Sequence, residues 1–204
     1  GLIGGYLVST AAQWAPQWNV RGVTRAEADL TDPMQVQELW DRSRPALVIH
    51  CAALSRTGAC EQDPARARHI NVDATRALAA AARDIPFIFL STDQVFDGAK
   101  GWYVETDAVH PLNVYGQTKA EAEQVVLENP AHSIVRIALT AGTSPTRDRS
   151  FVEDMLRTAA KGTKRPTLAG TSDAPSNTSA KALPIGQLAA ATPIRRDNGP
   201  ASSS

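Results

Sequence analysis

The chain has 204 residues with 21 basic and 21 acidic side chains, which fits one domain with or without a tail and excludes two full α/β lobes. Its net charge of zero gives no electrostatic footprint for nucleic acid or anionic membrane, and no apolar run approaches the roughly 20 residues of a membrane span. With two cysteines and no secretory signal at the N-terminus, we expect a cytoplasmic protein that binds neither nucleic acid nor membrane.

Before residue 163, apolar runs alternate with helical patterns, which predicts repeated βα units and a parallel sheet. The predicted elements in chain order are a helix over 4–13, a strand over 19–24, a helix over 32–42, a strand over 46–51, a long helix from 63 or 64 to 83, a strand over 86–91, a helix over 113–128, a strand over 133–139 and a helix over 151–161. Asp32 suits the N-cap of its helix and Pro33 the first helical position. The strand over 86–91 is very apolar, so we expect it at the centre of the sheet.

The predicted fold is a doubly wound parallel α/β sheet of the Rossmann type, with residues 1–162 as the dinucleotide-binding domain. Such a sheet needs a strand directly before its glycine-rich turn, so we expect the first strand to be missing and its neighbours to have open edges. All aromatic residues lie at or before Phe151, and residues 163–204 show no periodicity. We expect a low-complexity, mostly disordered tail there in place of a substrate lobe; an ordered but irregular lobe is the alternative.

The first four residues, Gly1-Leu2-Ile3-Gly4, stand at a helix entrance and match the back half of a dinucleotide-binding fingerprint. Glycine lets the backbone approach a pyrophosphate, which the helix N-terminus stabilises, although a packing role explains the same glycines equally well. The predicted strand over 19–24 ends beside Arg25 without an acidic residue to bind the ribose hydroxyls. A cation there suits a 2′-phosphate and favours NADP over NAD; otherwise Arg25 is a solvated surface charge.

The strongest chemical pattern combines Thr92, at the end of the predicted central strand, with Tyr115 and Lys119, at the start of a helix. Tyr115 and Lys119 are four residues apart, so they lie on one helix face. A phenol with a pKa of about 10 is a poor acid or base at neutral pH unless a nearby cation stabilises its phenolate, and Lys119 can supply that charge. Thr92 can hydrogen-bond a substrate oxygen while Tyr115 transfers its proton and hydride moves to or from carbon.

A series of short words in order makes the chain resemble the extended branch of the short-chain dehydrogenase/reductase family, and within it the dTDP-4-dehydrorhamnose reductase group. The words cover residues 1 to about 161: Gly1-Leu2-Ile3-Gly4, Asp29-Leu30-Thr31-Asp32, Cys51-Ala52-Ala53, Ile70-Asn71-Val72, the eight residues from Ser91 to Gly98, the nine from Pro111 to Lys119, and Phe151-Val152. The segment from Ser91 to Gly98 points to that group in particular.

This resemblance implies an NADP-dependent reductase of the keto group of a nucleotide-linked sugar, with NAD as the other candidate cofactor. It implies that Tyr115 donates the proton, that Lys119 adjusts its pKa and binds the ribose, and that Thr92 donates a hydrogen bond. The implied cofactor contacts are Gly1, Leu2, Ile3 and Gly4 at the pyrophosphate, Asp29 and Leu30 at the adenine, and Ala52, Ala53 and Leu54 beyond the third strand. Asn71 would sit in the helix that braces the active site, and a homodimer is allowed because related enzymes are often dimers.

Some positions depart from the family pattern. His50-Cys51 replaces the usual Asn-Ala, Gln94 stands where Tyr is common, and the pattern is not followed after Gly162. One alternative is a non-catalytic binding module that resembles the regulatory subunit of methionine adenosyltransferase, and another is an inactive fragment. We interpret His50 as a packed polar residue, and we expect no metal site because neither cysteine has a partner at zinc-ligand spacing.

Overall fold

The computed structural model describes residues 1–138 and 140. The described residues fall into two compact units, one that contains residues 1–22 and one that contains residues 23–138. The helix predicted over 151–161 and the tail predicted over 163–204 lie outside the described residues.

Within the described residues, the first unit contains helix α1 (Leu2–Trp14) and the segment after it. Helix α1 confirms the helix predicted over 4–13. Gly1 is the N-cap residue, and its carbonyl accepts a hydrogen bond from the backbone N–H of Gly5 at 2.9 Å. The chain passes close to α1 again at Gly22, where an added Cβ would lie 2.9 Å from Cγ2 of Val8. A larger residue at Gly22 would therefore displace the Val8 side chain.

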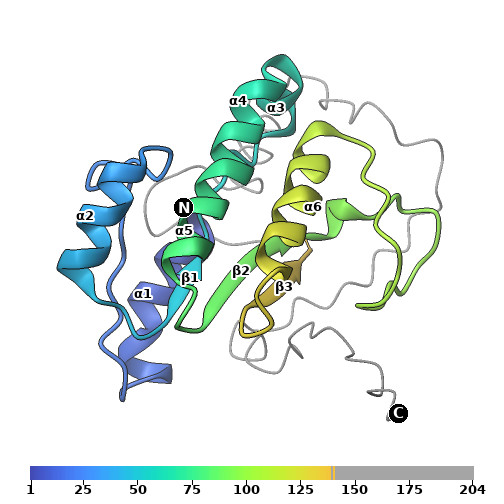
Figure 1. The fold of residues 1–204 in the computed structure, drawn as a ribbon. Coiled ribbons are helices and arrows are strands. Elements are labelled where there is room, and N and C mark those ends of the chain that lie inside the picture. Colours follow the sequence, from blue (N-terminus) through green and yellow to red (C-terminus); the bar gives the residue numbers. More distant parts are fainter. Residues whose placement is uncertain (139, 141–204) are drawn as a thin grey trace, which may run out of the picture. The chain divides into compact units, whose positions relative to one another are not determined.

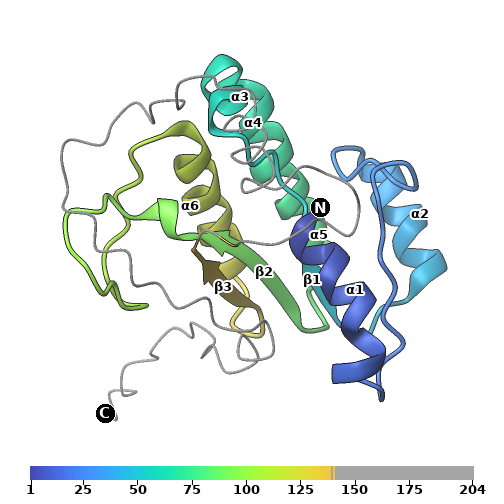
Figure 2. The ribbon, with the colours of Figure 1, turned by 180° about the vertical axis from the view of Figure 1, so that it is seen from behind.

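The second unit is built on a parallel three-stranded sheet in the order β1 (Val48–His50), β2 (Phe87–Thr92) and β3 (Ser133–Ile137). In its register Ile49 pairs with Ile88, and Phe89 pairs with Ile134. The sheet confirms three of the predicted strands, and β2 is central as its apolar composition predicted (Figure 2). Within the described residues, β1 forms a ladder along one edge only.

The strand predicted over 19–24 is wrong, because these residues are exposed and irregular. A strand is stable when its N–H and C=O groups pair with those of a neighbouring strand. In the part of the chain that the structure describes, the ladders join only β1, β2 and β3. Val20 and Val23 produced the apolar signal, but both side chains are exposed and bury little surface. The expected fourth strand of the alternation is therefore absent from the described residues.

Three helices lie side by side over one face of the sheet: α2 (Pro33–Ser43), α5 (Ala74–Ala81) and α6 (Val114–Leu127) (Figure 1). Phe87 and Phe89 point to these helices from β2, since residues two apart in a strand share a face. Ile134 of β3 completes the sheet side of the core, and burying each such side chain contributes roughly 1.5–3 kcal/mol. The helix side consists of Val36, Leu78, Ala79, Ala82, Ala122 and Val126.

Asp32 and Pro33 begin α2 as predicted. The Asp32 carboxylate accepts hydrogen bonds from the Met34 N–H at 2.9 Å and from Gln35 Nε2 at 2.8 Å. These bonds, that of Gln35 first, lower the pKa of Asp32 from its usual value. The cap satisfies a backbone donor that the first helical turn would otherwise leave without a partner.

The long helix predicted from residue 63 or 64 to 83 forms with two differences. It contains a π-helical turn (His69–Asp73) between α4 (Pro64–Arg68) and α5, and a separate short helix α3 (Thr57–Gln62) precedes it. A π turn has no signature in apolar periodicity, and six residues are too few to show a helical period. No helix within the described range is long and apolar enough to cross a bilayer.

The core assignment predicts that Ile134→Ala lowers the free energy of unfolding by about 2–5 kcal/mol, because it opens a cavity beneath the helices. The matched control is Ile49→Ala, since Ile49 is 40% exposed and Ile134 only 1%. Urea unfolding followed by circular dichroism measures both variants. Equal losses in the two would contradict the placement of Ile134 in the core.

Candidate active site

The three side chains predicted to be catalytic meet at the carboxyl end of β2. Thr92 is the last residue of that strand, and Tyr115 and Lys119 lie in the first two turns of α6. All three are buried, with 9% of Tyr115 and 2% of Lys119 exposed. The Tyr115 and Thr92 side chains lie close enough for Thr92 to lower the pKa of Tyr115. Two segments 23 residues apart in the sequence therefore present hydroxyl groups to one another.

The position of α6 depends on the turn that follows β2. An added Cβ on Gly116 would clash with the carbonyl oxygen of Gln94 and would lie 3.0 Å from Cβ of Pro111. Asn113 caps the helix by accepting a hydrogen bond from the Gly116 N–H at 2.7 Å, and its Nδ2 donates to Gln94 Oε1 at 3.0 Å. The helix start is thus in direct contact with the turn, which brings Tyr115 up to Thr92.

Tyr115 is a neutral phenol at physiological pH. Burial is the main cause that raises its pKa to about 12, and the Thr92 side chain opposes that change. The pKa of Tyr115 is therefore raised, whereas the charge of Lys119 alone would lower it. A protonated phenol is the form required of a group that donates a proton.

The Lys119 ammonium group lies beneath the end of β2. Its Nζ donates a hydrogen bond to the carbonyl oxygen of Leu90 at 2.6 Å and lies 3.8 Å from the ring centroid of Phe89. Burial lowers the pKa of Lys119 to about 7, while the negative charge of Glu123 raises it. Near neutral pH, Lys119 is therefore divided between its charged and neutral forms.

His50 is a packed polar residue, in agreement with the interpretation of the sequence. Its Nε2 lies 3.0 Å from Oγ1 of Thr75, whose hydroxyl donates to the carbonyl of Asn71 at 2.7 Å. Since Thr75 has a single proton to donate, His50 Nε2 is the donor in their bond. Burial, followed by the charge of Lys119, lowers the pKa of His50 to about 3, so the ring is neutral.

Asn71, in the π turn, connects the loop after β1 to α6. Its Oδ1 accepts from the Leu54 N–H at 2.7 Å, and its Nδ2 donates to the Leu54 carbonyl at 3.1 Å and to Thr118 Oγ1 at 2.9 Å. Cys60 adds a bond from its thiol to the same carbonyl at 3.2 Å. The contact of Cys60 had no sequence signal, because the thiol lies on α3, a helix that the periodicity did not reveal.

The loop after β1 carries three of the predicted cofactor contacts. Ala52 is exposed, and Ala53 and Leu54 are half-buried, so small and backbone groups are accessible there. The hydrogen bonds between Asn71 and the backbone of Leu54 hold this loop in place. The predicted pyrophosphate contacts, Gly1, Leu2, Ile3 and Gly4, belong to the first unit, where they form the N-terminal end of α1.

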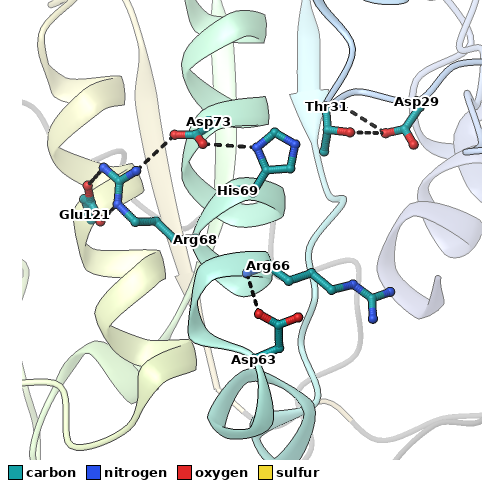
Figure 3. Close-up of polar contacts among 8 residues, drawn as sticks. All are labelled: Asp29, Thr31, Asp63, Arg66, Arg68, His69, Asp73 and Glu121. Atoms are coloured by element: carbon teal, nitrogen blue, oxygen red, sulfur yellow. Dashed lines mark hydrogen bonds and ion pairs between the residues drawn. The ribbon is translucent and has the colours of Figure 1, made fainter.

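Arg25, which the sequence predicts to bind the 2′-phosphate, forms an ion pair with Asp29, which is predicted to contact the adenine. Arg25 donates from Nη2 to Asp29 Oδ2 at 2.9 Å, and its side chain is exposed. The other carboxylate oxygen of Asp29 accepts from the N–H of Thr31 at 3.0 Å and from its hydroxyl at 2.7 Å (Figure 3). These bonds, those of Thr31 first, lower the pKa of Asp29 to about 2. Leu30 packs against the core beneath the helices.

A second polar cluster joins α4 to α6 at the surface. Arg68 forms an ion pair with Glu121 of α6 and another with Asp73 at 3.3 Å, and His69 Nδ1 lies 3.1 Å from Asp73 Oδ2 (Figure 3). These side chains are exposed, so each pair adds little stability. Nowhere in residues 1–138 or 140 do three His, Cys, Asp or Glu side chains form a group suited to a metal ion.

The close contact at Gly116 predicts that Gly116→Ala destabilises the protein by about 1–3 kcal/mol, because the new methyl group displaces the helix start from the turn. Gly58→Ala is the matched control, since Gly58 lies in a helix with nothing within 4 Å of its added Cβ. Thermal melting of both variants measures the difference. A Gly116→Ala variant that melts no lower than Gly58→Ala would show that the helix and the turn are not in tight contact.

Comparisons with known proteins reach beyond the described residues. Residues 1–195 match the family described as the RmlD substrate binding domain. The chain is 38% identical over 143 residues to dTDP-4-keto-6-deoxy-D-glucose reductase of Streptomyces niveus, covering 68% of this chain and 49% of that protein. It is also 38% identical over 132 residues to methionine adenosyltransferase 2 subunit beta of Bos taurus, covering 63% of this chain and 40% of that protein. The chain thus spans half or less of the length of these curated relatives.

Among solved structures, the chain resembles dTDP-4-dehydrorhamnose reductase from Bacillus anthracis in complex with NADP. The TM-score is 0.69 at 29% sequence identity, covering 79% of this chain and 57% of that one. This likeness agrees with the parallel sheet and its helical layer, and it confirms the Rossmann-like class. Because the family match runs along nearly the whole sequence, the resemblance to the extended short-chain dehydrogenases/reductases is confirmed, and the chain belongs to the RmlD family.

Proposed function

We propose that this chain carries the catalytic centre of an NADP-dependent reductase that acts on the keto group of a nucleotide-linked sugar. The observation that carries the proposal is the meeting of Thr92, Tyr115 and Lys119 at the carboxyl end of β2. The similarity to reductases of dTDP-linked sugars supports both the reaction type and the substrate class.

The three side chains divide the work of such a reduction. Tyr115 is protonated at neutral pH and donates its proton to the carbonyl oxygen, while the Thr92 hydroxyl hydrogen-bonds the same oxygen. NADPH, when bound, supplies the hydride. The positive charge of Lys119, one helical turn from Tyr115, favours the phenolate that remains after proton transfer.

The residues in place suit a dinucleotide. Ala52, Ala53 and Leu54 would hold it beyond β1, and Arg25 would meet the 2′-phosphate beside Asp29 and Leu30. Lys119 and Tyr115 would bind the ribose next to the nicotinamide. A Lys119 ammonium that already donates to a backbone oxygen at 2.6 Å has two further N–H groups for ribose hydroxyls.

A second candidate function is a non-catalytic subunit that binds a dinucleotide and a protein partner. The similarity to methionine adenosyltransferase 2 subunit beta favours it, at an identity equal to that with the reductase. The two candidates differ in turnover: both bind cofactor, but only the reductase oxidises NADPH in the presence of a keto sugar.

The catalytic assignment predicts that Tyr115→Phe lowers kcat by about 10²–10⁴-fold, because the proton donor is lost. The dissociation constant for NADPH should rise about tenfold at most, far less than kcat falls, since only one hydrogen bond to the ribose is lost. NADPH oxidation with a dTDP-linked 4-keto-6-deoxy sugar measures turnover, and fluorescence titration measures binding.

Tyr103→Phe is the matched control for this variant, because the Tyr103 hydroxyl donates to Asp97 in the loop before α6. It should keep full turnover. Full activity in Tyr115→Phe would refute the catalytic assignment. Saturable NADPH binding without turnover in the unaltered protein would instead favour the subunit function.

The cofactor assignment predicts that Arg25→Ala weakens NADPH binding about tenfold, the scale of a lost charge-assisted hydrogen bond, and leaves NADH binding unchanged. Arg42→Ala is the control, since Arg42 is an exposed arginine that pairs with Glu27 at 3.6 Å. Fluorescence titrations with both nucleotides measure the ratio. Equal losses for NADPH and NADH would contradict a contact between Arg25 and the 2′-phosphate.

A further inference from the structure

An ion pair between a buried carboxylate and a half-buried arginine lies one helical turn beyond Lys119. Glu123 is one helical turn after Lys119 on α6 and is completely buried. Its two oxygens accept from Arg136 of β3, Oε1 from Nε at 2.9 Å and Oε2 from Nη2 at 2.7 Å. The Arg136 guanidinium in turn lies 4.9 Å from the ring centroid of Phe96. Both partners of this pair are thus fixed in a single geometry.

A gain in folding stability does not explain why such an ion pair is present. Removing two charges from water costs several kcal/mol per ion, and replacing such a pair by apolar residues is often neutral or stabilising. Within the described residues, Glu123 is the one buried carboxylate. Its position four residues after Lys119 suggests that it acts on that lysine.

The other groups around Lys119 do not supply a compensating negative charge. From β1, His50 is neutral because its pKa is lowered to about 3, and burial raises the pKa of Cys51 to about 11. Tyr115, on the same helix, is neutral as well. The remaining neighbours are the Leu90 carbonyl and the Phe89 ring on β2, and Arg136 on β3, which is bound to Glu123.

We propose that Glu123, held in place by Arg136, is a positioning residue that keeps the Lys119 ammonium charged and directed toward the end of β2. Because both carboxylate oxygens bind Arg136, Glu123 does not draw Lys119 into a direct ion pair, and Nζ stays on the Leu90 carbonyl. Glu123 therefore acts on Lys119 through its field. The importance of that charge for catalysis rests on the proposed reductase function.

The sign of the effect follows from the surroundings of Lys119. Burial lowers the pKa of Lys119 to about 7, and Glu123 is the first cause that opposes it. Without Glu123 the pKa falls further, so a smaller fraction of Lys119 is charged at pH 7. Where the charged form is required, activity at neutral pH then falls and the pH limit of activity moves downward.

The direct test is an NMR titration of the full chain with lysine labelled at ¹³Cε. The chain has five lysines, and the Lys119 signal is assigned by its loss in Lys119→Met. In Glu123→Gln the titration midpoint of Lys119 should fall by about one pH unit or more, equivalent to a tenfold change in its acid dissociation constant. Glu121→Gln, on the same helix but exposed and paired with Arg68, should leave it unchanged (Figure 3).

A second variant is needed in case Glu123→Gln does not fold. Glu123→Gln leaves the half-buried Arg136 without its counter-charge, which is destabilising. In Glu123→Gln/Arg136→Met both charges are removed, and the midpoint should again lie below that of the unaltered protein. A Lys119 midpoint that stays unchanged in whichever of these variants folds would overturn the proposal.

The titration needs no turnover, so failure of the two proposals can be told apart. A lower midpoint together with an equal downward movement of the pH limit of kcat/KM supports both. A lower midpoint in a protein that turns over no keto sugar supports the role of Glu123 and counts against the reductase. Turnover with an unmoved midpoint supports the reductase and overturns the role of Glu123.

Discussion

The close approach of α6 to the turn after β2 determines the rest of the site. At Gly116 there is no space for a side chain, because the Gln94 carbonyl occupies it. The Asn113 cap fixes the same junction from the helix side. A residue with a Cβ at this position would separate Tyr115 from Thr92. The hydroxyl pair at the strand end thus depends on a backbone contact rather than on the hydroxyls themselves.

Desolvation dominates the chemistry of this junction. Burial raises the pKa of Tyr115 to about 12 and lowers that of Lys119 to about 7, so it favours the neutral form of both groups. A proton donor benefits from this change, whereas a cationic modulator is weakened by it. Glu123, which is paired with Arg136, partly opposes the effect of burial by raising the pKa of Lys119.

The loop after β1 shows a second way in which the fold prepares the site. Asn71 bonds to both backbone groups of Leu54 and to Thr118 of α6. The helix changes to a π turn at this residue, a distortion that is common at functional sites. One amide side chain therefore holds the predicted cofactor loop in register with the helix that carries Tyr115 and Lys119.

The sequence by itself determined the elements whose signals are local. Asp32 and Pro33 define the start of α2, the apolar run at Phe87 defines a central strand, and the spacing of Tyr115 and Lys119 places them on one helix face. These signals depend on caps, burial and helical period, which neighbouring residues settle among themselves.

The tertiary structure decided what depends on distant partners. Residues 19–24 have strand-like composition, yet a strand forms only where another strand accepts its hydrogen bonds. Arg25 forms an ion pair with Asp29. Glu123, one helical turn after Lys119, is bound by Arg136, 13 residues further along the chain. Protonation states depend on burial and on charges brought together by folding. The sequence therefore identified the titratable groups of the site but not their protonation states.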